Sequence, residues 1–182
     1  MTARRTNSLA AASALVCCLP LAACDPMSAP LVRHQAAFQP ADDGELRIWP
    51  GQDCTRVRQV SVELEEAEGQ PRDTWVLRSE QTVGATFTGL TLDEAPAGFE
   101  VSREWQDDPV WTDAKTVWVR VTTTEGQTSS YVSVGSMLED DDHGDDEFYV
   151  EDEGWLTQDE FRTKAGDDEG IAPLCGPGTP AD

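Results

Sequence analysis

Basic residues are scarce in this sequence. Its 182 residues include 13 lysines and arginines against 35 aspartates and glutamates, which gives a formal net charge of −22. Nucleic-acid binding requires clustered basic side chains to neutralise phosphates, and a direct electrostatic hold on anionic lipid requires the same. The sequence therefore predicts no nucleic-acid partner. It leaves cations, basic protein surfaces and neutral ligands as candidate partners.

The sequence also lacks the motifs of common enzymes. It has two histidines, His34 and His143, and no Gly-x-Ser-x-Gly, Ser-x-x-Lys or phosphate-binding glycine loop. Nucleophilic hydrolysis needs an activated serine or cysteine beside a base, and no such set is visible. We expect no catalytic residues, no cofactor and no dedicated metal cluster. A glycan-acting enzyme that uses two carboxylates is the least favoured alternative.

The N-terminal apolar run is too short to cross a membrane. It extends from Leu9 to Leu21, 13 residues against the ~20 that a spanning helix needs. Two arginines precede it, and small residues follow it directly before Cys24. A charged start, a short apolar run and a small-residue cleavage site are typical of a secretory signal. Residues 1–23 are therefore predicted to be a signal peptide.

The end of this run, Leu21-Ala22-Ala23-Cys24, resembles the lipobox of bacterial lipoproteins. The resemblance implies that the Cys24 thiol receives a diacylglyceryl group and that a dedicated peptidase cuts before it. Membrane lipid would then hold the mature chain, with its 35 acids and 11 bases, on the cell membrane facing outside the cytoplasm. Each buried methylene adds ~0.8 kcal/mol of membrane affinity, so two acyl chains anchor firmly. The alternative is an ordinary cleaved signal with Cys24 merely nearby.

The five cysteines divide into two groups. Cys17 and Cys18 leave with the signal and Cys24 carries the lipid, so Cys54 and Cys175 remain as the one pair in an oxidising compartment. A disulfide between them would close a loop of about 120 residues, worth roughly 4–5 kcal/mol in the chain-entropy account. The alternative is two reduced thiols.

The hydrophobic pattern changes along the mature chain. Residues 24–43 have no sustained periodicity and are predicted to form a flexible tether. Between residues 44 and 137 the period becomes two, which is typical of strands with one wet face. The predicted strands follow at spacings of about ten residues. They are Leu46–Pro50, Val60–Glu65, Thr74–Ser79, Thr82–Leu90, Phe99–Trp105, Lys115–Thr124 and Ser130–Val134.

Short strands separated by turn residues predict a mainly β fold. We expect an antiparallel β-sandwich of the immunoglobulin-like type with disordered termini, and a small barrel is the structural alternative. Thr88-Gly89-Leu90 and the later Phe99-Glu-Val101 resemble the strand-turn-strand of fibronectin type III modules. That resemblance covers about fifteen residues and implies the same class of sandwich.

One predicted strand offers a candidate binding surface. Lys115–Thr124 has three valines on one face, which places Trp118 and Arg120 on the other. An exposed tryptophan can mark a binding surface, and an arginine over its ring would make a cation–π contact. The alternative, which we favour, is that a second layer or the C-terminal extension covers the indole.

Residues 138–182 are predicted to form an acidic C-terminal extension. Ten acids lie within residues 139–153. The candidate binding residues among them are Asp140, Asp141, Asp142, Asp145 and Asp146. The run resembles calcium loops, but an EF-hand alignment on Gly144 puts His143 and Val150 at ligand positions, so that pattern fails. A weak divalent-cation site is an alternative to solvated, mobile chain.

A short helix is predicted after the acidic run. Thr157 suits the N-cap and Glu160 the third helical position, as in a capping box. Leu156 and Phe161 would form the accompanying hydrophobic staple, and the helix should stop by Gly166.

These features together predict a membrane-anchored, extracytoplasmic lipoprotein. We expect it to act as a non-catalytic binding or interaction module of the cell envelope, with an envelope protein as partner. The alternative is a lipoprotein that binds a divalent cation or another small ligand.

Overall fold

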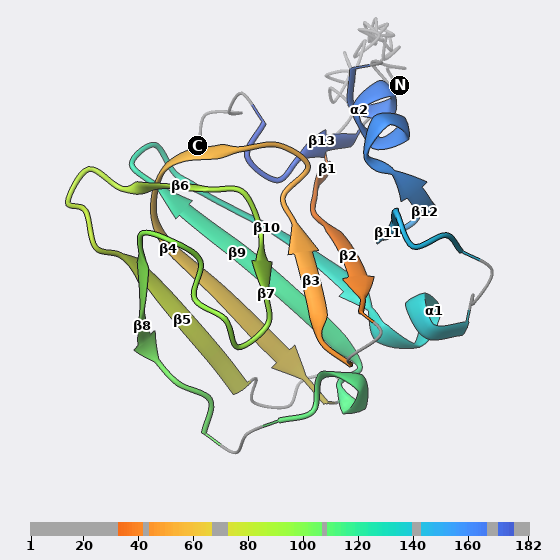
Figure 1. Ribbon diagram of the computed structural model, residues 1–182, viewed down its shortest axis with the longest axis horizontal. Coiled ribbons are helices and arrows are strands. Elements are labelled where there is room, and N and C mark those ends of the chain that lie inside the picture. Colours follow the sequence, from red (N-terminus) through yellow and green to blue (C-terminus); the bar gives the residue numbers. More distant parts are fainter. Residues whose placement is uncertain are drawn as a thin grey trace, which may run out of the picture.

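Two antiparallel sheets packed face to face form the body of the protein (Figure 1). The computed structural model describes residues 33–41, 44–66, 73–106, 109–139, 143–166 and 171–176. The first sheet has the order β10-β9-β4-β5-β8, with β6 paired to β4. Its strands are β4 (Cys54–Glu65), β5 (Asp73–Ser79), β6 (Ala85–Phe87), β8 (Phe99–Arg103), β9 (Thr116–Thr123) and β10 (Gln127–Ser133).

The second sheet has the order β12-β11-β2-β3-β7. Its strands are β2 (Ala37–Pro40), β3 (Leu46–Trp49), β7 (Leu90–Thr91), β11 (Glu147–Val150) and β12 (Gly154–Thr157). Beside the sheets, β1 (Arg33–Gln35) pairs in parallel with β13 (Ile171–Pro173). In the described ranges the helices are α1 (Val134–Glu139) and α2 (Gln158–Gly166), and a 3₁₀ turn covers Trp111–Asp113.

The predicted fold class is confirmed. In the second sheet β3 lies between β2 and β7, and in the first sheet β9 lies between β4 and β10. These are the A-B-E and C-F-G orders of an immunoglobulin-like sandwich. Strands β5 and β8 extend the first sheet beyond β4, while β11 and β12 extend the second beyond β2.

The core lies between the two sheets and follows the predicted period of two. On β9, Val117, Val119 and Val121 are fully buried, while the residues between them are only partly buried. The same cluster includes Trp75 of β5 and Phe38 of β2, which are at most 1% exposed. Alternation therefore identified the inward faces of the long strands correctly.

The segment predicted as one strand, Thr82–Leu90, is two strands in different sheets. β6 pairs with β4 of the first sheet, and β7 pairs with β3 of the second. The chain changes sheets at Gly89, where an added Cβ would lie 2.8 Å from the carbonyl oxygen of Ile48. A glycine permits this close backbone approach, and a continuous strand through it is excluded.

The tether prediction is wrong for Arg33–Pro40. These residues form β1 and β2, and Ala36, Ala37 and Phe38 are fully buried. The small alanines allow close packing on both sides of the segment, while Phe38 pairs with Ile48 of β3 and with Tyr149 of β11. Residues 24–32, 42 and 43 of the predicted tether lie outside the described residues, as does the predicted signal peptide 1–23.

The C-terminal extension is not separate from the sandwich either. β11 and β12 continue the second sheet, and β13 pairs with β1. The predicted disulfide Cys54–Cys175 is present, with Cα atoms 5.3 Å apart, and it ties the start of β4 to the residues after β13. The predicted helix is α2, whereas α1 was not expected. None of the helices in the described part of the chain is long and apolar enough to cross a membrane.

Candidate functional site

A second, smaller apolar cluster lies on the outer face of the second sheet. It contains Ala37, Val150, Leu156 and Phe161, with Trp49, Phe148 and Ala165 packed against it. Because neighbouring side chains in a strand point to opposite faces, Trp49 of β3 and Phe148 of β11 point away from the main core. Helix α2 covers part of this outer face through Phe161, which is 1% exposed.

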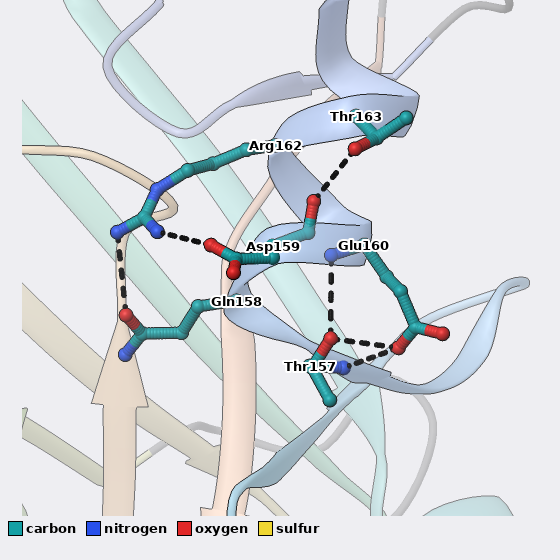
Figure 2. Close-up of polar contacts among 6 residues, drawn as sticks. All are labelled: Thr157, Gln158, Asp159, Glu160, Arg162 and Thr163. Carbon is teal, nitrogen blue, oxygen red and sulfur yellow. Dashed lines mark hydrogen bonds and ion pairs between the residues drawn. The ribbon is translucent and has the colours of Figure 1, made fainter.

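The start of α2 is fixed by the predicted capping box (Figure 2). The Glu160 backbone N–H donates to Thr157 Oγ1 at 3.3 Å, and the Thr157 backbone N–H donates to Glu160 Oε2 at 2.9 Å. The Thr157 hydroxyl also donates to Glu160 Oε2, at 2.8 Å. Hydrogen bonds from the Thr157 backbone and then from its hydroxyl hold the pKa of Glu160 below its ordinary value. The Leu156–Phe161 staple is also formed, since both side chains belong to the same buried cluster.

Arg162 lies on the other side of α2 from Glu160 (Figure 2). Its guanidinium donates to Asp159 Oδ1 at 2.9 Å and to Gln158 Oε1 at 3.3 Å. The same guanidinium carbon lies 5.6 Å from the centre of the Trp49 ring, within the range of a cation–π contact. Arg162 therefore links the first turn of α2 to the aromatic side chains of the sheet.

The aromatic side chains form a connected row. The Trp49 ring centre lies 5.3 Å from that of Phe161, in an edge-to-face arrangement, and 5.7 Å from that of Phe148. Trp49 and Phe148 are both only partly buried. Partly exposed aromatic rings held by neighbours offer a rigid contact surface with little side-chain entropy to lose.

Two hollows meet at Phe148, and we call them together the aromatic–acidic groove. The apolar half has a volume of about 340 Å³. Its lining includes Trp49, Leu90, Pro96 and Phe148, with Arg47 and Glu94 as its charged residues. The acidic half has a volume of about 420 Å³. Its lining includes Gln39, Asp145, Asp146, Phe148, Asp159 and Arg162.

Gln39 supports the turn that carries the acids. Its side chain is 6% exposed, and Nε2 donates to the carbonyl oxygens of Asp145 at 2.8 Å and Glu147 at 3.0 Å. A carbonyl oxygen can only accept, so these two bonds fix which end of the amide is the nitrogen. Within the described residues Oε1 accepts no hydrogen bond, and no buried side-chain atom there is left without a partner. Oε1 is therefore not fully buried, and Gln39 is one of the residues that line the acidic half.

The predicted acidic residues are only partly described. Asp145 and Asp146 line the groove and are exposed, whereas Asp140, Asp141 and Asp142 lie outside the described residues. No group of three or more metal-ligating side chains occurs among the described residues. The divalent-cation site stays a prediction, as does the lipidation of Cys24.

Trp118 and Arg120 lie apart from the groove, on the outer face of the first sheet. The Trp118 ring packs on Tyr131 of β10 with centres 4.8 Å apart, and its Nε1 donates to Glu65 at 3.2 Å. Arg120 donates to Glu63 Oε1 at 2.7 Å. The guanidinium of Arg120 is therefore paired with a carboxylate, and a binding role for Trp118 and Arg120 stays a prediction.

Several groove residues were not singled out from the sequence. Trp49 follows the alternation of Leu46 and Ile48, which already places it on the outward face of its strand. Phe148 and Gln39 carried no comparable signal, because their roles depend on pairing between segments over a hundred residues apart.

No known family model, curated protein or solved structure matches the chain.

Proposed function

We propose that the protein is a lipid-anchored, extracytoplasmic lipoprotein whose sandwich is a non-catalytic binding module of the cell envelope. The lipobox resemblance at Leu21-Ala22-Ala23-Cys24 supports the anchor and the location. The observation that carries the binding role is the aromatic–acidic groove, which joins partly exposed rings of the sheet to the carboxylates of Asp145 and Asp146.

The distance between anchor and domain limits where a partner can be met. Eight residues separate Cys24 from Arg33, the first residue of β1, so nine Cα–Cα steps join the two. Even when fully extended, nine such steps reach only about 30 Å. A lipid on Cys24 would hold the sandwich close to the membrane surface, so the proposed partner is one that is present there.

The anchor is tested by substitution at the lipobox. Cys24→Ser should prevent incorporation of an alkyne-labelled fatty acid and move the protein from the membrane fraction to the soluble fraction. Cys18→Ser is the matched control, because that cysteine is predicted to leave with the signal. Equal labelling of the Cys24→Ser protein would contradict the proposal.

The binding role is tested by crosslinking in intact cells. A photoreactive amino acid replaces Glu94, on the rim of the apolar half, and captured proteins are identified by mass spectrometry. The control position is Val83, which is 67% exposed and lies outside the groove. We expect a defined partner from position 94 that Asp145→Asn/Asp146→Asn removes. The same captured proteins from both positions would argue against a specific groove.

A further inference from the structure

We infer that the aromatic–acidic groove binds an extended, basic segment of a partner protein. The segment places an arginine or lysine head in the acidic half and a neighbouring apolar side chain in the apolar half. The inference rests on the proposed function as a binding module and adds the chemistry of the ligand.

The hydrogen-bond acceptors of the acidic half favour a ligand that carries hydrogen-bond donors. The carboxylates of Asp145 and Asp146 can only accept when ionised, and Gln39, whose Oε1 is not fully buried, lines the same hollow. The Gln39 amide cannot turn over, because its Nε2 already donates to two carbonyl oxygens. Guanidinium and ammonium groups are donors only, so either is the chemical complement of these acceptors.

The net negative charge of the acidic half favours a cationic ligand. Its lining carries three carboxylates and one guanidinium. Asp159 is paired with Arg162, whereas Asp145 and Asp146 make no ion pair with any described residue. The hollow therefore keeps two uncompensated negative charges, within a chain of net charge −22 that attracts cations from a distance.

The apolar half requires that the cation be attached to something larger. Phe148 lines both halves, so the two hollows adjoin each other at this residue. In the apolar half Arg47 and Glu94 carry opposite charges, so the net charge of its lining is zero. Trp49, Leu90 and Pro96 supply the contact surface. A bare metal ion would leave that surface unused, and a neutral sugar would leave the carboxylates uncompensated.

An extended peptide meets both requirements in one ligand. Its side chains alternate between two faces, so residues two apart lie on the same face about 7 Å from each other. An arginine and a leucine at that spacing would enter the acidic and apolar halves together. The rings of Trp49 and Phe148 would cover the aliphatic part of the arginine between them.

The test uses defined peptides and the full chain purified in detergent. Capped, fluorescently labelled pentapeptides carry one arginine and one leucine, separated by zero, one or two glycines, and their dissociation constants are measured by fluorescence polarisation. We expect the one-glycine spacing to bind best. Replacing its arginine by glutamine, or its leucine by serine, should weaken binding by about tenfold or more, as for loss of a charge-assisted or buried contact.

Matched variants locate the site on the protein. Asp145→Asn/Asp146→Asn should weaken the arginine–leucine peptide by about tenfold or more. Asp53→Asn/Asp113→Asn removes the same charge from two exposed positions outside the groove and should leave binding within about twofold. Unchanged thermal melting of both proteins shows that the substitutions act on binding.

The outcomes separate this inference from the proposed function. Failure of every peptide to bind at ~1 mM, or equal weakening by the two double variants, overturns the basic-segment inference. Binding of a neutral saccharide in the groove, unaffected by Asp145→Asn/Asp146→Asn, also overturns it but leaves the binding module standing. If the natural protein gives no crosslinked partner specific to position 94, that result would count against the binding module itself.

Discussion

The ring of Phe161 lies directly on the backbone of Gly51. A Cβ at position 51 would stand 2.5 Å from Phe161 Cε1, closer than real contacts allow, and the φ angle of Gly51 is +84°. The residue after the Trp49-Pro50 pair must therefore be glycine for two independent reasons. Through this contact α2 is seated on the outer face of the second sheet, where it borders the aromatic–acidic groove.

The two reasons can be separated by a pair of substitutions. Gly154 has a similar φ of +81°, but an added Cβ there would meet nothing within 4 Å. Gly154→Ala should cost about 1–2 kcal/mol from backbone strain alone. Gly51→Ala should cost about 1–3 kcal/mol more, because Phe161 must move. Urea denaturation of both proteins measures the difference, and equal losses would show that the Phe161 contact carries no stability.

The disulfide should be the largest single contribution to stability. Cys54–Cys175 closes a loop over a sequence separation of 121 residues, which restricts the unfolded chain. Cys54→Ser/Cys175→Ser is expected to lower the free energy of unfolding by about 4–5 kcal/mol. The measurement is denaturation of both proteins with and without reductant. Reductant should destabilise the natural protein and leave the double variant unchanged; an effect on both would assign the loss to another cause.

The sequence allowed the long strands and the helix cap to be predicted because both depend on local patterns. The valines of β9 alternate with polar residues, and Thr157 with Glu160 forms a spacing that needs no distant partner. Local chemistry and the final structure agree at these places, so a few neighbouring residues are sufficient to predict the element.

The segments that were missed depend on distant partners. Ala36, Ala37 and Phe38 are buried in succession, because Ala36 and Phe38 belong to the main core and Ala37 belongs to the outer cluster that α2 covers. A segment that is buried on both sides shows no alternation of apolar and polar residues. The groove also depends on contacts between residues that are distant in the chain. Trp49 and Phe148 are far apart in the chain, and only the pairing of β2 with both β3 and β11 brings them together.

Acid should loosen the first turn of α2. The pKa of Glu160 is lowered from its ordinary value of 4.5 by hydrogen bonds from the Thr157 backbone and then from the Thr157 hydroxyl. Because the folded-state pKa is below the unfolded one, the stabilisation is complete above pH 4.5 and is lost as the pH falls through the lower folded-state value.

Hydrogen exchange of the α2 amides between pH 6 and pH 3 would measure this loosening, after correction for the intrinsic exchange rate. Glu160→Gln should remove most of the pH dependence, since glutamine keeps an acceptor but has no charge to lose. Glu100→Gln, at an exposed position on β8, is the control and should leave the response of α2 unchanged. The same acid response in Glu160→Gln and the natural protein would rule out the capping carboxylate as its source.

Substitutions of the pair Glu63–Arg120 test whether the outer face of the first sheet only stabilises the fold or also binds a partner. Glu63 is 8% exposed, and its carboxylate accepts from Arg120 at 2.7 Å. Arg120→Leu leaves that carboxylate buried without the guanidinium, and we expect a loss of about 1–3 kcal/mol, less than for a fully buried pair because Arg120 is partly exposed. Adding Glu63→Gln removes the buried charge, so the double variant should regain most of the stability in urea denaturation. If the double variant also keeps the partner captured from position 94, Arg120 serves the fold. If it regains stability but loses that partner, Arg120 belongs to a binding surface and the groove is not the whole of the interface.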